Sequence, residues 1–342
     1  MESKSLYLPS LRLIFRKFFH GLLMAEIKIG TTIQRRDLSA ILTIFRLTPE
    51  QGSSFHAYKA GQYISLRRDN CRLTKRMVGQ DGKISYAPDL DEHGVQKRGV
   101  VTHSYSISSA PYETEEEGWL EFYVILERDE HGNPGRLTES LFQLDPNTDN
   151  KVSYFYKIAG DFTLDKRAAG FKNVVLVGTG SGLAPFAAMI KQLHHEALLG
   201  KPTDARITLI HANRGLNELG YQKELLNIEA AQKFDFLYVP SVSRPAKEDL
   251  ENVAIGKGRG NNLLRSVFGM PLKEEQELKI LGAQKQDTTH AKAALERAVR
   301  PVLPKHISKD RLIARMSPQK TVILCCGNPL SMDDINYIAE AT

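Results

Sequence analysis

A glycine-rich loop behind a short apolar run is the feature that most constrains how this chain can fold. The run NVVLV, residues 173–177, has the length and β-branched content of a buried parallel strand. The loop GTGSGLAPF, residues 178–186, follows it, and Pro185 suits the first turn of a helix, where its missing N–H goes unused. A strand, a glycine turn and a helix N-terminus present free backbone N–H groups to an anion, so this stretch predicts a phosphate site.

The loop matches none of the stricter motifs built on glycine. Gly178 and Gly180 fit the first two positions of G-x-G-x-x-G, but Leu183 occupies the third, and no Gly-Lys-Ser/Thr follows. A nucleophile elbow is excluded because Thr179 and Leu183 stand where it needs glycines. A tight strand-to-helix connection without function is the alternative interpretation. The loop alone therefore predicts a phosphate but does not say which ligand carries it.

The sequence changes its pattern near residue 169. Before it, β-rich runs such as AILTIFRL (40–47) and LEFYVIL (120–126) alternate with turn clusters, which predicts an antiparallel barrel or sandwich. After it, apolar strands alternate with helical segments, which predicts a parallel sheet. The expected fold class is β + α/β, in which an antiparallel β-barrel precedes a parallel-sheet α/β nucleotide-binding domain.

These patterns also predict the domain limits. The barrel domain is assigned to residues 27–168 with a polar insertion at 70–98, and the α/β domain to residues 169–342 with an insertion at 270–318. Residues 1–26 are expected to form a basic amphipathic extension. Within it, residues 10–24 carry apolar side chains on one helical face: Leu11, Phe15, Phe18 and Leu22. They predict a helix that contacts a membrane surface or a partner, unless translation starts at Met24.

Composition excludes several classes of protein. With 46 basic and 40 acidic residues spread along the chain, the net charge of +6 favours acidic partners but not nucleic acid. The three cysteines, Cys71, Cys325 and Cys326, form no C-x-x-C pair, which predicts a reduced, cytoplasmic protein without a four-cysteine cluster. His194 and His195 are adjacent on a predicted helix and are expected to be solvated, so no metal site is predicted.

Several short segments together carry a resemblance to a known family. They are GQYISL (61–66), HSYSISSAP (103–111), GRLTESL (135–141), GTGSGLAPF (178–186), HANRGLNELGYQKEL (211–225), PSVSRP (240–245), GKGRGNNLL (256–264) and VILCCGNPLSM (322–332). In these segments the chain resembles the ferredoxin–NADP reductase family, especially its bacterial ferredoxin/flavodoxin reductases. The resemblance spans about residues 35–342 outside the two insertions, and it implies that the barrel binds FAD and the α/β domain binds NADP(H).

The resemblance assigns flavin contacts to the barrel. His103, Tyr105 and Ser106 occupy the family's R-x-Y-S flavin motif; Tyr105 is expected to stack on the isoalloxazine and Ser106 to hydrogen-bond near its N5 atom. His103 departs from the family's arginine, and a partly charged histidine predicts weaker FAD retention as the pH rises through its pKa. The helix start that is expected to meet the FAD pyrophosphate contains Gly135, Leu137 and Thr138.

The resemblance assigns NADP contacts to the α/β domain. The pyrophosphate is expected at the loop residues Gly178, Thr179, Gly180 and Pro185. The adenosine 2′-phosphate is expected among hydroxyl and guanidinium groups, which favour NADP over NAD: Arg214, Ser243, Arg244 and Arg259. The turn beside the nicotinamide contains Cys326, Gly327 and Asn328, and Cys326 is counted with Tyr105 and Ser106 as catalytic.

The function implied by the resemblance is hydride transfer between NADP(H) and FAD, with single electrons passed to or from an acidic ferredoxin or flavodoxin. Three alternatives stay open at this point. The chain is a reductase component of an oxygenase that uses NADH, a flavin-bearing subunit of a larger electron-transfer assembly, or a nucleotide-binding fold without catalysis.

Overall fold

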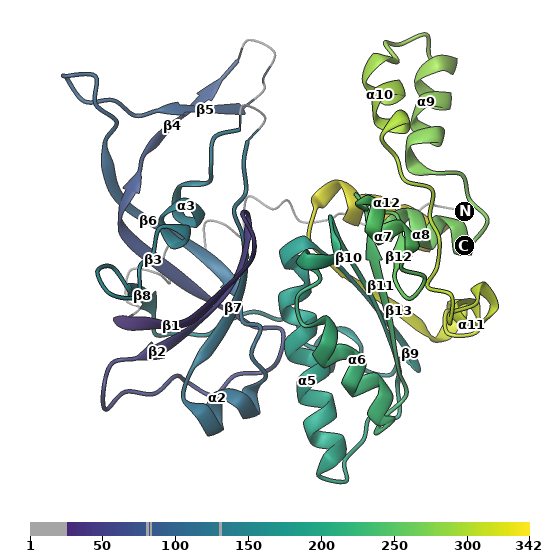
Figure 1. The fold of residues 1–342 in the computed structure, drawn as a ribbon, viewed down its shortest axis with the longest axis horizontal. Coiled ribbons are helices and arrows are strands. Elements are labelled where there is room, and N and C mark those ends of the chain that lie inside the picture. Colours follow the sequence, from purple (N-terminus) through teal and green to yellow (C-terminus); the bar gives the residue numbers. More distant parts are fainter. Residues whose placement is uncertain (1–25, 80–81, 83, 130–131) are drawn as a thin grey trace, which may run out of the picture.

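Two sheets of opposite character make up the molecule (Figure 1). The computed structural model describes residues 26–342 except 80–81, 83 and 130–131. The predicted helix at residues 10–24 lies outside the described residues. An antiparallel sheet forms from residues 27–155 and a parallel sheet from residues 173–326, so the predicted fold class is confirmed.

The antiparallel sheet has six strands in the order β6-β3-β8-β1-β2-β7. They are β1 (Ile27–Ser39), β2 (Leu42–Pro49), β3 (Tyr63–Arg72), β6 (Arg98–Ser106), β7 (Leu120–Ile125) and β8 (Lys151–Phe155). Their inward side chains, including Phe45, Leu66 and Phe122, bury one core. The two edge strands, β6 and β7, do not pair with each other along their length, so the barrel is not fully closed. One hydrogen bond bridges them: the backbone N–H of Ser108, just after β6, donates to the carbonyl of Glu121 in β7 at 2.8 Å.

Short helices and one hairpin flank this sheet. Helices α2 (Pro111–Glu117) and α3 (Arg136–Phe142) connect its strands, and α4 (Leu164–Arg167) leads out of it. The segment predicted as an insertion at 70–98 contains a separate two-stranded sheet, β4 (Thr74–Val78) paired with β5 (Ile84–Pro88). The hairpin continues from strands β3 and β6, so it projects beyond the sheet (Figure 1).

The parallel sheet has five strands in the order β12-β11-β10-β9-β13. They are β9 (Asn173–Thr179), β10 (Arg206–Asn213), β11 (Phe236–Val242), β12 (Gly256–Lys257) and β13 (Thr321–Cys326). Consecutive residues of β9 face opposite sides, where Leu176 packs against α5 and Val175 against the helices of the other face. Both faces are therefore covered, which explains why these strands read as continuous apolar runs.

The helices around this sheet are α5 (Ala184–Leu198), α6 (Gln222–Ala231), α7 (Lys247–Glu251), α8 (Gly260–Val267), α9 (Lys273–Ala283), α10 (Thr289–Glu296), α11 (Lys309–Ile313) and α12 (Pro329–Ala341), with short 3₁₀ turns η1 (Gly180–Leu183), η2 (Leu216–Glu218) and η3 (Pro318–Lys320). Pro185 lies in the first turn of α5, as predicted. No helix in the described part of the chain has the length and apolar content needed to cross a bilayer.

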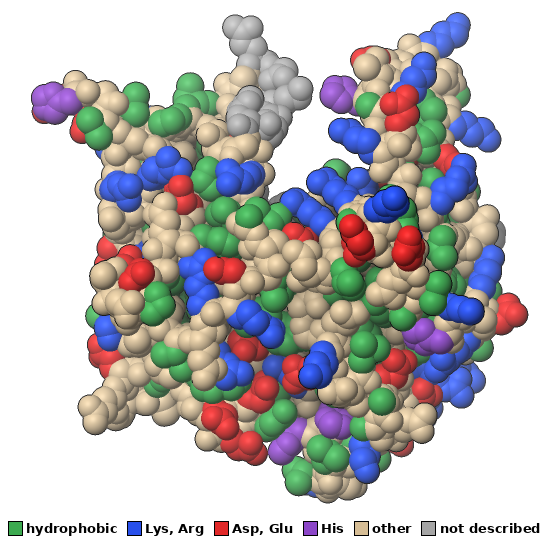
Figure 2. Space-filling view, viewed as in Figure 1, with side chains coloured by type: hydrophobic (Ala, Val, Ile, Leu, Met, Phe, Trp, Pro, Cys, Tyr) green, Lys and Arg blue, Asp and Glu red, His purple; other side chains and the backbone are tan. Residues whose placement is uncertain are grey.

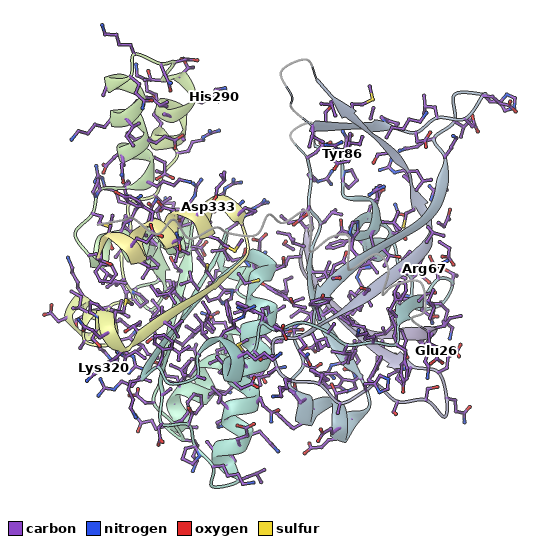
Figure 3. The ribbon with its side chains drawn as sticks, turned by 180° about the vertical axis from the view of Figure 1, so that it is seen from behind. Glu26, Arg67, Tyr86, His290, Lys320 and Asp333 are labelled. Carbon is purple, nitrogen blue, oxygen red and sulfur yellow. The ribbon has the colours of Figure 1, made fainter. Side chains whose placement is uncertain are left out.

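The segment at 270–318 forms a second projection. Helices α9 and α10 pack side by side and extend from the same side of the molecule as the β4–β5 hairpin, where Figure 3 labels Tyr86 and His290. At its base, the guanidinium of Arg265 pairs with the carboxylate of Asp334 on α12, with both side chains buried. Near the C-terminal end of the segment, Arg315 anchors it to the parallel sheet, because its Nε donates to Thr208 Oγ1 on β10 at 2.8 Å. The limits of both insertions and of the two domains stay predictions.

Candidate active site

A cavity of about 380 Å³ lies between the two sheets, within the range of roughly 300–1,000 Å³ typical of small-molecule sites. The antiparallel half lines it with the end of β6, part of β7 and the start of α3. The parallel half lines it with η1 and the turn after β13. The lining residues are His103, Ser104, Tyr105, Ser106, Tyr123, Val124, Ile125, Glu127, Gly135, Arg136, Leu137, Thr138, Ser181, Gly182, Ala184, Cys326 and Gly327.

The glycine loop is pressed against the turn after β13. A Cβ atom on Gly182 would lie 2.1 Å from the carbonyl oxygen of Cys326, and one on Gly327 would lie 2.1 Å from Thr179 Oγ1. Gly327 also has φ of 133°, a conformation that side chains rarely adopt. The backbone N–H of Asn328 donates to Thr179 Oγ1 at 3.1 Å. The glycines therefore let two strand ends meet at the cavity wall.

Two polar side chains of the cavity, Tyr105 and Cys326, are uncharged near neutral pH. Burial raises the pKa of the Tyr105 phenol above its ordinary value. Burial also raises the pKa of the Cys326 thiol to about 11, so the thiol keeps its proton near neutral pH. The cavity thus offers hydroxyl, thiol and backbone groups around one aromatic ring, with Glu127 and Arg136 at one end.

Outside this cavity, three strands of the parallel sheet, β10, β11 and β12, end side by side. The backbone N–H of Ser243 donates to the carbonyl of Asn213 at 2.8 Å, and that of Arg244 to the carbonyl of Arg214 at 2.8 Å. The N–H of Gly258, which precedes Arg259, donates to the carbonyl of Val242 at 2.9 Å. The exposed side chains that follow β10, β11 and β12 therefore share one edge of the sheet.

Sequence and structure comparisons identify related proteins. Residues 176–257 match the family described as the oxidoreductase NAD-binding domain. A ferredoxin–NADP reductase of Azotobacter vinelandii is 31% identical over 173 residues, which cover 48% of this chain and 58% of the relative. A flavohemoprotein of Halalkalibacterium halodurans is 27% identical over 219 residues, or 63% of this chain and 43% of the relative. The chain thus spans about half the length of these curated relatives.

One solved structure carries the comparison further. A ferredoxin NADP⁺ reductase of Neisseria gonorrhoeae, crystallised with FAD and NADP, aligns over 93% of this chain and 92% of its own with a TM-score of 0.54 at 18% identity. The predicted resemblance to the ferredoxin–NADP reductase family is confirmed. At this identity the solved structure establishes the shared two-domain fold. The match of residues 176–257 to the NAD-binding domain family supports the relationship for the parallel half by sequence.

Against the ferredoxin–NADP reductase pattern, the main departure is His103. We expected a partly charged imidazole, but burial lowers the pKa of His103 and the nearby Arg136 lowers it further. The lowered pKa favours the neutral form of His103 near pH 7, so its charge is expected to change little as the pH rises above 7. The guanidinium of Arg136 lines the same cavity. Arg136 is not among the predicted site residues, although a guanidinium in the segment GRLTESL, beside a helix start, is a sequence signal for a phosphate contact.

The structure brings about half of the predicted residues, eight of seventeen, to the cavity. His103, Tyr105, Ser106, Cys326 and Gly327 line it together with the start of α3. The glycine loop contributes other members than those predicted: Ser181, Gly182 and Ala184 line the cavity. Gly178, Thr179, Gly180, Pro185 and Asn328 support the loop and the turn from behind or beside it.

The histidines on α5 differ from their prediction. His195 stacks on Tyr112 with ring centroids 4.0 Å apart, and burial lowers the pKa of His194. His195 thus packs against the other half of the molecule, and both histidines are half-buried instead of fully solvated. Among the described residues, no cluster of three or more His, Cys, Asp or Glu side chains is placed to hold a metal ion.

A second, larger cavity of about 790 Å³ also lies between the two sheets, but it is lined by charges. The ammonium of Lys191, 2% exposed, lies 2.6 Å from Glu113 Oε2 and 3.8 Å from Glu121 Oε1. The hydroxyl of Tyr221 donates to Glu121 Oε1 at 2.8 Å and lies 2.9 Å from Ser108 Oγ, whose hydroxyl can donate to it. These contacts join α5 and α6 to the antiparallel half, so this region holds the two halves together.

Proposed function

We propose that the chain is an FAD-dependent oxidoreductase that transfers hydride between NADP(H) and FAD. The observation that carries the proposal is the first cavity, in which the end of β6 with Tyr105 faces the glycine loop and Cys326 across the junction of the two halves. Two ring systems need such a place to meet face to face, and hydride transfer between them requires positioning more than acid or base groups.

The residues present fit a flavin on the antiparallel side. Tyr105 offers an aromatic face, Ser106 a hydroxyl beside it, and the first turn of α3 backbone N–H groups at Leu137 and Thr138. Arg136 would pair with a phosphate there, while the neutral His103 donates or accepts a hydrogen bond. The flavin, when bound, supplies the exchange between two-electron and one-electron chemistry.

The residues present also fit a dinucleotide on the parallel side. The loop before α5 would meet the pyrophosphate with backbone N–H groups of a helix start. Arg214 and Arg244, which form no ion pair in the described part of the chain, would meet the 2′-phosphate together with Ser243 and Arg259. We therefore propose NADP(H) as the preferred nucleotide. Cys326, uncharged at the nicotinamide end, would keep water away without adding charge.

We propose ferredoxin or flavodoxin as the electron carrier. Both are acidic proteins, and the net charge of +6 favours an encounter with them. Figure 2 shows Lys and Arg side chains along the α9–α10 projection and near its base. The three free thiols are consistent with a cytoplasmic location.

An anaerobic titration of the FAD-reconstituted protein tests the proposal. NADPH should bleach the flavin absorbance bands much faster than NADH does. Equal or faster bleaching by NADH would overturn the nucleotide preference but keep the enzyme class. Absence of bound flavin, or absence of bleaching by either nucleotide, would contradict the proposed function.

A second candidate function is a flavin-bearing subunit of a larger electron-transfer or oxygenase complex. One face of the β4–β5 hairpin exposes Val78, Ile84 and Tyr86, each at least half exposed, and isolated two-stranded sheets are marginally stable on their own. Rapid NADPH-dependent reduction of ferricyanide by the isolated chain would favour a free-standing reductase. Little activity alone, restored by a co-purifying partner, would favour the subunit.

A further inference from the structure

The segment at 270–318 reaches into the proposed nucleotide site through one carboxylate. Glu274, in the first turn of α9, is 2% exposed. Its Oε1 atom accepts a hydrogen bond from Arg259 Nη1 at 2.8 Å, and its Oε2 atom accepts one from Asn262 Nδ2 at 2.9 Å. Both carboxylate oxygens thus face donors of α8 or of the residue before it, as an ionised carboxylate requires.

The partners of Glu274 are themselves fixed. Asn262 is 1% exposed, and its Oδ1 atom accepts a hydrogen bond from the backbone N–H of Lys273 at 3.0 Å. Arg259 is the residue directly before α8, so its backbone position is set by the end of β12. Its side chain is 54% exposed, while that of Glu274 is 3% exposed. The carboxylate is therefore held in place, and the guanidinium extends from it toward solvent.

Arg259 differs in this respect from the other arginines of the same edge. Arg214 and Arg244 follow β10 and β11, and within the described residues their guanidinium groups have no carboxylate partner. The backbone bonds between these strand ends keep Arg214, Arg244 and Arg259 on neighbouring strands. Of the three cations, only Arg259 is already neutralised by a buried anion.

We propose that Glu274 is a specificity-determining residue that weakens discrimination in favour of the 2′-phosphate of NADP(H). The inference rests on the proposed function, in which Arg259 faces that phosphate. A 2′-phosphate is a dianion, and the negative charge of a carboxylate that pairs with the same guanidinium repels it. The pairing with Glu274 also holds Arg259 in one rotamer, which favours binding. For a dianionic ligand we expect this gain in affinity to be smaller than the loss from repulsion.

The consequence is a site that accepts NADH more readily than its arginines indicate. An unphosphorylated adenosine ribose carries no charge for Glu274 to repel, so only the phosphorylated nucleotide is penalised. The α9 segment thus adjusts nucleotide preference from outside the glycine loop. A conservative test replaces the carboxylate with an amide, because Glu274→Gln keeps the shape and one acceptor but removes the charge.

Isothermal titration of the FAD-loaded protein with adenosine 2′,5′-bisphosphate and with 5′-AMP tests the inference without turnover. Glu274→Gln should tighten binding of the bisphosphate by roughly tenfold, the worth of a Coulomb interaction across one guanidinium group, and leave 5′-AMP unchanged. Glu275→Gln is the matched control: it removes a neighbouring charge of the same helix turn, and Glu275 caps Leu272 N at 3.0 Å instead of touching Arg259. It should change neither affinity.

The other outcomes are equally informative. Unchanged or weaker bisphosphate binding by a folded Glu274→Gln protein would overturn the inference and leave the proposed function standing. Arg259→Gln provides a second readout, because it should weaken bisphosphate binding and leave 5′-AMP binding unchanged. A wild-type protein that binds neither nucleotide would overturn the nucleotide site itself, and the inference with it.

Discussion

The two cavities between the sheets differ in what fills their walls. The smaller one is lined by glycines, hydroxyls, a thiol and two tyrosines, with Glu127 and Arg136 as its charged side chains, and burial keeps Tyr105 and Cys326 protonated. The larger one is crossed by the ion pairs of Lys191 and by a hydrogen bond from Tyr221 to Glu121. Both lie on the junction of the same two halves.

This difference indicates that one cavity fixes the two halves relative to each other and the other accommodates a ligand. Buried charges that satisfy one another fix the relative position of two halves, because moving them apart leaves charges without partners. In the smaller cavity, the close backbone contacts and the protonated Tyr105 and Cys326 leave room for flat rings between the two halves. We infer that the buried ion pairs of the larger cavity maintain the geometry that the smaller cavity uses.

The largest expected effect comes from breaking the charged junction. Lys191→Met leaves the largely buried Glu113 without its cation and Glu121 with Arg46 alone, which should cost about 3–5 kcal/mol of unfolding free energy. Urea denaturation followed by tryptophan fluorescence measures it. Lys59→Met, which removes one partner of an exposed pair with Asp165, is the control and should change little. A change of similar size in both variants would contradict the role of the buried junction.

The next effect comes from the wall of the smaller cavity. Gly182→Ala places a methyl group 2.1 Å from the Cys326 carbonyl oxygen, so the loop must move away from the turn after β13. We expect a loss of about 1–3 kcal/mol in stability and a fall of roughly 100-fold in the rate of flavin reduction by NADPH. Stopped-flow absorbance measures the rate. Gly282→Ala, where a Cβ meets nothing within 4 Å, should leave the rate unchanged.

A smaller effect distinguishes the two candidates for the FAD phosphate. Arg136→Ala should raise the FAD dissociation constant by roughly 10- to 100-fold, because a charge-assisted hydrogen bond is lost. His103→Ala should cost less, since a neutral imidazole contributes no charge. Recovery of flavin fluorescence on release measures both. Arg98→Ala serves as the control, because Arg98 lies on β6 like His103 but donates to the carbonyl of Asn70. Equal losses for all three would remove the special role of Arg136.

The smallest effect concerns pH. The pKa of His103 is lowered in the folded protein, so the unfolded chain binds the extra proton first as the pH falls. FAD retention and stability should therefore be flat between about pH 7 and 9, with the histidine's penalty entering only below its ordinary pKa of about 6.5. Equilibrium dialysis across this range measures retention. A steady weakening from pH 7 upward would restore the cationic histidine that the sequence suggested.

Local patterns predicted most of the fold. The apolar run before the glycine loop, the alternation of β-rich segments before residue 169 and Pro185 at a helix start each depend on neighbours in the chain, and strand period and helix caps act over a few residues. The same holds for Tyr105 and Ser106, which were recognised from a continuous motif and lie in the cavity.

Other features depended on residues far apart in the sequence. The pairing of Arg259 with Glu274 and the burial that lowers the pKa of His103 arise only when separate elements pack together. No period or spacing in the chain marks Lys191 as the cation of the junction, because its partners Glu113 and Glu121 belong to the other half.

The sequence by itself determined two sheets, their order along the chain and the family of motifs at their ends, because these follow from short-range periodicity and turn chemistry. Only the tertiary structure decided which charges are paired, which groups are neutral and which glycines allow close approach. Electrostatic energies depend on distance and on burial, and neither is defined until the chain has folded.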